Sequence, residues 1–228
     1  SNGGADYMHW SSNGDALHWA MGPTVYTAQT KAFYPNGPLA KDAKPVKFAP
    51  PKDGVSLSMT VQSEHPTGLV AFTGARVVTM AAKDGGIIDN AVILVENDRI
   101  KSVGKTGDFA IPAGAKTVDV AGKTIIPGLV DAHAHGPHGV DEMTPQQNWV
   151  NMLNLAMGIT TRHDPSSSAA TVFPALEMQR AGLIIGPRSF STGEIVYGAK
   201  SADVYAEING LDDALAHVRR LKAQGAHS

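Results

Sequence analysis

The chain has 228 residues, of which 43% are hydrophobic and 18% are charged, and its net charge at pH 7 is −2. This ordinary globular composition and length indicate one or two domains. A nearly balanced charge without a long Lys/Arg block argues against a nucleic-acid-binding or membrane-surface protein. No apolar run reaches the ~18 residues of a membrane span. The lack of cysteine excludes disulfides and thiolate metal ligands, and it fits either a reducing compartment or a disulfide-free exported protein.

Residues 1–29 are predicted to form a β-hairpin. Aromatic residues lie on both sides of Asn13-Gly14, and Asn-Gly suits the positive-φ positions of a tight turn. The pattern Trp-Ser-x-Asn-Gly-x-x-Leu, which begins at Trp10, resembles one blade of a TolB-type β-propeller. A lone hairpin is only marginally stable. The segment is therefore interpreted either as a hairpin packed on a neighbouring domain or, as we favour, as a propeller remnant.

Residues 30–54 contain five prolines and are predicted to be an extended connector, because proline fixes φ and lacks an amide donor. Residues 55–123 are predicted to form a small β-sandwich. Apolar residues alternate with polar ones from 55 to 61, as is typical of a half-buried strand. Asn97-Asp98 is expected to form a two-residue turn. Further strands are expected at 71–79, 91–96, 99–103 and 117–120.

Residues 124–228 change to an alternation of strands and helices. Thr144–Gln147 has the form of a capping box with proline at the first helical position. The helix that follows would carry Trp149, Met152, Leu153 and Ala156 on one side and end at Gly158. Ser168 is expected to cap a second helix that ends near Gly182. A third helix is expected to end at Gly225, and its apolar face would comprise Leu211, Ala214, Leu215, Val218 and Leu221.

Strands are expected between these helices at 159–164, 187–193 and from 226 to 228. Such a series makes a parallel sheet with right-handed crossovers, so the fold class is α/β. A closed (β/α)8 barrel needs about 250 residues, and residues 124–228 have room for fewer than half of its units. We therefore expect the N-terminal part of a TIM barrel, completed by further sequence or by a companion chain. A complete flavodoxin-like fold is the alternative.

The segment from Ile125 to His135 is the most informative part of the sequence. An apolar run, expected to be a buried strand, ends in His133-Ala134-His135, and Asp131 precedes the pair by two residues. Side chains alternate along a strand, so Asp131, His133 and His135 would share one face. Residues two apart lie roughly 6.6 Å from each other, and two imidazoles at that separation can bind one ion with bonds of about 2.0–2.1 Å. A short His-x-His motif can also arise by chance.

The residues from Lys123 to His135 resemble the first barrel strand of the amidohydrolase superfamily of metal-dependent hydrolases. Residues 69–80 and 87–104 resemble the small β-sandwich that precedes this barrel, and the imidazolonepropionase-like and prolidase-like subgroup is the most similar in character. The resemblance implies one or two zinc ions held in part by His133 and His135. It also implies a Lys or Glu on strand four, histidines on strands five and six, and an aspartate general base on strand eight.

None of these further ligands, from strands four, five, six and eight, lies within this sequence, so no catalytic residue is assigned to this chain and the general base is expected beyond Ser228. His227 would lie at the start of strand four, at the wrong end of the barrel to be a ligand. The resemblance thus implies a hydrolase that cleaves C–N bonds of amides, cyclic amides or dipeptides by metal-activated water. The chain alone, with two ligands, is expected to bind metal weakly and to be inactive.

Other side chains are candidates for contact with the substrate or with the metal ligands. Asp131 lies one layer deeper than the histidine pair. His138 follows the pair on a loop, where a solvated histidine is expected and contact with the substrate is the alternative. His163 and Asp164 end the second strand, and alternation allows only one of them to point inward. Tyr197 lies in the loop after the third strand, where barrel enzymes set specificity. Arg162 and Arg188 are interpreted as structural ion-pair partners.

Two other functions stay open from the sequence alone. The protein could be a propeller-linked binding or scaffold module without catalysis, or a metal-dependent hydrolase of phosphoester or C–O bonds. The expected partners are a small amide or peptide substrate and the rest of the barrel, without nucleic acid or membrane. The resemblance favours a periplasmic or secreted protein over a cytoplasmic one.

Overall fold

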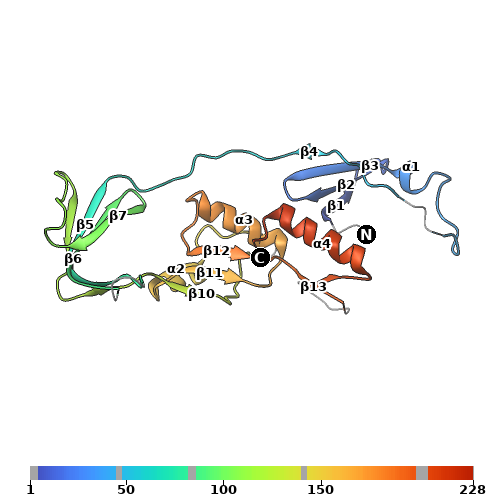
Figure 1. Ribbon diagram of the computed structural model, residues 1–228. Coiled ribbons are helices and arrows are strands. Elements are labelled where there is room, and N and C mark those ends of the chain that lie inside the picture. The colour runs from blue at the N-terminus through green and yellow to red at the C-terminus, as the bar shows by residue number, and fades with distance from the viewer. Residues whose placement is uncertain (1–4, 45–47, 82–85, 140–142, 199–204, 228) are drawn as a thin grey trace.

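The computed structural model describes residues 5–44, 48–81, 86–139, 143–198 and 205–227. Figure 1 shows a small antiparallel sheet next to the last helix, a second antiparallel-rich sheet at the opposite end, and a parallel sheet with helices between them. A long extended segment joins the first sheet to the second. The candidate site lies in the parallel part.

The N-terminal sheet is antiparallel. It has the order β1 (Asp6–Trp10), β2 (Ala16–Met21), β3 (Thr24–Gln29) and β4 (Val55–Ser56), with the short helix α1 (Thr30–Phe33) after β3. The predicted hairpin is confirmed, but its connection spans residues 11–15 rather than two residues. Within it only Gly14 has a positive φ, of 74°, and its amide donates to the Ser11 carbonyl at 2.9 Å.

The half-buried strand predicted from residue 55 to 61 is wrong. Pairing stops at Ser56, and Met59 is 82% exposed. The segment instead crosses the molecule in extended form toward β5 (Figure 1). It contacts the end of α3 (Ala169–Arg180), where the Ser63 hydroxyl donates to the Arg180 carbonyl at 2.9 Å and the Glu64 amide to the Ala181 carbonyl at 2.9 Å.

The second sheet has five strands. Their order is β7-β6-β5-β8, with β9 also paired to β5, and their bounds are β5 (Leu69–Val78), β6 (Ile87–Glu96), β7 (Arg99–Lys105), β8 (Lys116–Asp119) and β9 (Thr124–Ile125). Ala75, Val77, Ala91 and Ile93 form its buried core. The predicted turn at Asn97 is confirmed, with Asn97 at a φ of 57°. The described strands form one sheet, so the sandwich itself stays a prediction.

The third sheet is parallel, as the alternation predicted. It has the order β10 (Leu129–Asp131), β11 (Ile159–Asp164) and β12 (Arg188–Ser191). The helices α2 (Trp149–Ala156), α3 and α4 (Leu211–Gln224) belong to the same part, as does a parallel pair of β13 (Ile195–Tyr197) and β14 (Tyr205–Glu207). The His227 amide donates to the Ser191 carbonyl at 3.3 Å. The chain therefore continues beside β12 where the fourth strand was expected; Ser228 lies outside the described residues.

Helix α3 forms the apolar core of this part. Val172, Phe173 and Leu176 are buried together with Leu221 from α4. Burial of a large apolar side chain contributes about 1.5–3 kcal/mol, so this cluster holds α3 and α4 together. Gly158, Gly182 and Gly225 follow α2, α3 and α4 with positive φ, which confirms the three predicted helix ends.

Three local predictions in this part are wrong. Asn148, not the Thr144 capping box, caps α2, because its side-chain oxygen accepts from the amides of Val150 and Asn151 at 3.0 and 3.4 Å. Strand β10 is not buried, since Val130 is 67% exposed at the edge of the described sheet. Of the predicted apolar face of α4, Leu221 is buried whereas Leu211, Leu215 and Val218 are exposed; the buried face instead includes His217 and Arg220.

Among the described residues, no helix combines the length and the apolar character that crossing a membrane requires.

Candidate functional site

The candidate site lies where the carboxyl ends of the three parallel strands meet. Asp131 ends β10, Asp164 ends β11 and Ser191 ends β12. The register pairs Asp131 with Arg162 and Asp164 with Ser191. In barrels of β/α units this edge carries the functional side chains, so the local sequence places acidic and histidine side chains at the edge where chemistry is expected.

The histidine pair lies just beyond β10 and not on it. The strand ends at Asp131, and a turn covers His133. The backbone stays attached to β11, because the Ala134 amide donates to the His163 carbonyl at 2.8 Å. The centroids of the His133 and His135 rings lie 4.9 Å apart with their planes at 83°. Both side chains are exposed, so the two imidazoles stand together at the surface of the described chain.

Asp164 is the centre of the polar contacts at this edge, and it is 2% exposed. Its Oδ2 accepts from His138 Nε2 at 2.8 Å, and its Oδ1 accepts from the Ser166 amide at 3.0 Å. Oδ1 also lies 3.3 Å from His135 Nδ1. Burial by itself raises the pKa of Asp164, but the hydrogen bonds from His138 and Ser166 and the two nearby imidazoles outweigh it, so the pKa lies below its usual value.

His138 is buried, which corrects the expectation of a solvated loop histidine. It is 3% exposed, and its ring lies between Asp164 and Arg162, whose Nη2 is 3.4 Å from His138 Nδ1. Pro137, which precedes His138, is also held in place, because the side-chain amide of Asn148 donates to its carbonyl at 2.8 Å. The loop after β10 is therefore folded back onto the ends of the strands by the start of α2.

Arg162 and Arg188 behave differently. Arg162 is 3% exposed, and its Nε donates to the Ser189 hydroxyl at 2.8 Å. Burial lowers the pKa of Arg162, and attraction to Asp164 and Asp131 partly opposes that effect. Arg188 is exposed, and it forms no ion pair with any residue that the structure describes. Within the described residues neither arginine forms the predicted ion pair, and Arg162 is held instead by its hydrogen bonds to Ser189 and His138.

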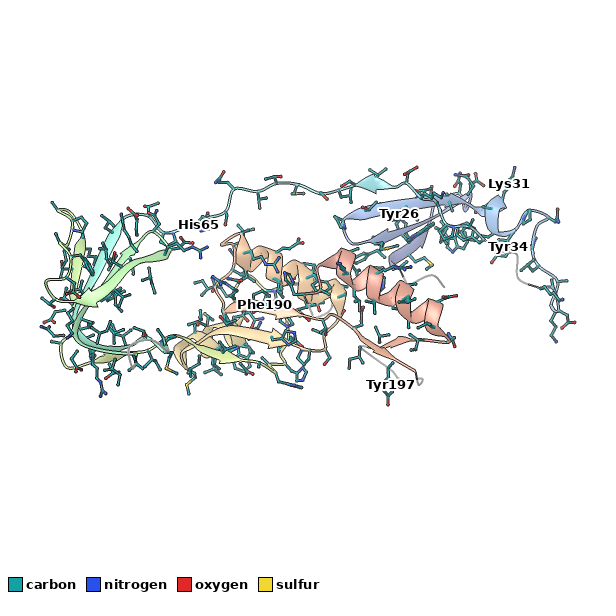
Figure 2. All side chains as sticks on the ribbon, in the orientation of Figure 1. Tyr26, Lys31, Tyr34, His65, Phe190 and Tyr197 are labelled. Carbon is teal, nitrogen blue, oxygen red and sulfur yellow. The ribbon has the colours of Figure 1, made fainter. Side chains whose placement is uncertain are left out.

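The other candidates take separate positions. Asp131 is partly buried, and its Oδ1 accepts from the His133 amide at 3.1 Å, so it holds the backbone of the histidine turn. Of the two residues that end β11, Asp164 contacts His135 and His138. Tyr197 on β13 is half exposed and points away from α3 and α4 (Figure 2). The structure does not bring Tyr197 into the cluster around Asp164.

Sequence reasoning missed that His138, Arg162 and Asp164 form one buried cluster. The available signal was the run Arg162-His163-Asp164 at the end of an otherwise half-buried strand. Charged residues are buried only when they are paired, so this run indicated that a partner had to come from another loop. Nothing local identified that partner as His138.

A divalent metal ion needs several donor atoms in one place. Two neighbouring imidazoles are good zinc donors, but a catalytic zinc uses three protein ligands and a water. Within the described ranges, no group of three or more His, Asp or Glu side chains is arranged to hold a metal ion. His133 and His135 therefore fit a metal as part of a ligand set and need further ligands to complete it.

Several curated proteins are similar in sequence to this chain, although no model of a known protein family matches it. An imidazolonepropionase from Sphingopyxis alaskensis is 40% identical over 80 residues, which are 35% of this chain and 18% of that protein. A dihydroorotase from Geobacter sulfurreducens is 30% identical over 148 residues, 62% of this chain and 33% of that protein. A 5-methylthioadenosine/S-adenosylhomocysteine deaminase from Bacillus cereus is 40% identical over 65 residues, 28% and 14% of the two chains.

Solved structures agree with these sequence relatives. One of them is the crystal structure of a "putative prolidase" from Bifidobacterium longum. It superposes with a TM-score of 0.56 at 25% identity, over 71% of this chain and 40% of that one. In sequence and in fold, the chain is similar to proteins of the amidohydrolase superfamily. A Xaa-Pro dipeptidase structure with bound methionine, at 18% identity, shares the fold with a TM-score of 0.55 over 70% of this chain and 45% of that one.

This similarity supports the family expected from residues 123–135 and a fold related to the TIM-barrel proteins of that superfamily. The named relatives are hydrolases that act on C–N bonds. This chain spans a third or less of the length of each of these curated relatives. The propeller resemblance of the N-terminal hairpin has no support among these comparisons and stays a prediction.

Proposed function

We propose that this amidohydrolase chain is part of a metal-dependent hydrolase that cleaves a C–N bond in an amide, a cyclic amide or a dipeptide. The observation that carries the proposal is the pair of exposed imidazoles of His133 and His135, 4.9 Å apart at the carboxyl edge of the parallel sheet. The relatives that act on C–N bonds support the reaction class.

In this proposal His133 and His135 bind a zinc ion, or one of two. When bound, zinc would supply a Lewis acid and a water of lowered pKa. Asp131 fixes the turn of His133 through the backbone hydrogen bond already described. The remaining ligands, a Lys or Glu, two histidines and an aspartate general base, would come from further sequence or from a companion chain. Tyr197 stays a proposed substrate contact, because β13 follows the third parallel strand.

Metal analysis of the purified complete protein tests the proposal. The double substitution His133→Ala and His135→Ala should remove bound zinc and amide hydrolysis together. The matched control is His9→Ala with His18→Ala, because these two rings are also neighbours, with centroids 5.1 Å apart, but belong to the N-terminal sheet. The control should keep the zinc content and the activity of the wild type.

Equal zinc content and equal activity in both double variants would contradict the proposal and favour a binding or scaffold module. A panel of N-acyl amino acids, cyclic amides, dipeptides and phosphomonoesters then distinguishes the bond that is cleaved. Hydrolysis of phosphomonoesters alone would favour phosphoester cleavage over C–N bond cleavage.

A further inference from the structure

We propose that Asp164 is a positioning residue that holds the His135 imidazole through Nδ1, so that Nε2 is the nitrogen that binds the metal. This inference rests on the proposed function of His135. Its geometric basis is the 3.3 Å separation between His135 Nδ1 and Asp164 Oδ1. A carboxylate on one ring nitrogen of a metal-binding histidine fixes the tautomer and the direction of the ring.

The carboxylate is available for this role because its other contacts are fixed. An ionised carboxylate only accepts hydrogen bonds, so His138 Nε2 must carry a proton where it meets Asp164 Oδ2 at 2.8 Å. In a neutral ring, His138 Nδ1 is then an acceptor, and it faces Arg162 Nη2 at 3.4 Å. The donors and acceptors on both sides of the His138 ring therefore match.

The same chain of contacts continues into β12. Arg162 Nε donates to the Ser189 hydroxyl at 2.8 Å, and that hydroxyl donates to the Pro187 carbonyl at 2.9 Å. The Ser166 amide holds Asp164 Oδ1 from the opposite direction at 3.0 Å. Buried partners on two strands and two loops thus fix the position of the carboxylate before any ligand arrives.

The contrast between the two imidazoles separates a positioning role from a purely structural one. The His138 side chain is 2% exposed, whereas the His135 side chain is 53% exposed. A carboxylate that only stabilised the fold would need only the buried ring. Asp164 Oδ1 also approaches the exposed ring of His135, next to His133, and this contact indicates a positioning role. Ordering that ring before metal binding lowers the entropy that binding must overcome.

The ring tautomer gives a test that needs neither metal nor activity. In the metal-free protein, two-dimensional 1H–15N spectra of the imidazoles, assigned with His135→Gln, should show the proton of neutral His135 on Nδ1. Asp164→Asn should move it toward the Nε2–H form that is usual for free histidine. The matched control is Asp213→Asn, because Asp213 also contacts a histidine, His217, at 3.8 Å on α4. That control should leave His135 unchanged.

Zinc affinity gives the second readout, measured by competition with a chromophoric chelator on the complete protein. We expect Asp164→Asn to weaken zinc binding about 10–100-fold, as is typical for loss of an outer partner of a ligand, and Asp213→Asn to leave it unchanged. An Nε2–H tautomer for His135 in the wild type would overturn the inference even if Asp164→Asn failed to fold. Unchanged zinc affinity in a folded Asp164→Asn variant would overturn it as well.

Failure of the inference and failure of the proposed function give different results. If the complete wild-type protein bound no zinc, or if its zinc did not depend on His133 and His135, the proposed function and the metal-directed role of Asp164 would both be wrong. If zinc depended on the pair but not on Asp164, only the present inference would be wrong.

Discussion

Replacement of Arg162 by leucine tests the buried polar cluster most directly. The substitution removes a hydrogen bond to Ser189, a weaker one to His138, and the positive charge that faces Asp164. Asp164 is 2% exposed, so water cannot replace the lost charge. Hydrogen bonds that involve a charged group typically contribute about 1.5–3 kcal/mol each, and this substitution removes two of them. The cost of burying Arg162, which lowers the pKa of Arg162, is regained in the variant, so we expect a loss of about 3 kcal/mol, the lower end for two such bonds.

Urea unfolding followed by far-UV circular dichroism measures this change in the free energy of unfolding. The matched control is Arg188→Leu, one strand away in the same sheet, where the side chain is exposed. Exposed substitutions of this kind usually change stability by less than about 0.5 kcal/mol. Equal effects of the two substitutions would refute the view that Arg162 stabilises the cluster, and would assign its burial to packing of the side-chain stem alone.

Two further predictions concern the segments that hold the site and the parallel sheet. Asn148→Ala should destabilise the chain by about 1 kcal/mol or more through loss of the α2 cap, whereas Thr144→Ala should have little effect. Thermal unfolding measures both changes. A larger loss of stability for Thr144→Ala would favour the capping box predicted from the sequence. Gly182→Ala should lower the free energy of unfolding clearly more than Gly158→Ala, for which ~1 kcal/mol is expected. Both glycines have a positive φ. Only at position 182 would the added Cβ also lie 2.7 Å from a backbone oxygen, that of Glu64. Equal urea midpoints for the two glycine variants would contradict this reasoning.

The predictable parts of the fold were those encoded by neighbouring residues. The alternation of strand and helix predicted the parallel order of β10, β11 and β12, and the glycines predicted the three helix ends. Asn97 predicted the turn between β6 and β7. The strand that leads to His133 and His135 was found from its sequence, although β10 stops at Asp131 because the chain turns before the histidines.

The parts that were missed depend on contacts between distant segments. Nothing near His138 indicates that it is buried, because its partners Arg162 and Asp164 come from another strand. The alternating residues from 55 to 61 have the pattern of a half-buried strand, but the described strand pairing ends at Ser56, and the Leu57 amide adds one further bond to the Pro23 carbonyl at 2.7 Å. Periodicity finds the faces of α4 but cannot tell which face is covered, and Arg220 is buried because Glu194 meets it at 2.8 Å.

The contact between the crossing segment and α3 has a consequence for the order of folding. The last carbonyls of α3 are satisfied by Ser63 and Glu64, and Ser63 lies 117 positions before Arg180 in the chain. Closing so long a loop carries an entropic cost and is slow compared with helix formation. During synthesis the donors emerge from the ribosome long before their acceptors. We therefore expect this end of α3 to fray in early intermediates and to become protected from hydrogen exchange only after the N-terminal sheet and the five-stranded sheet have assembled.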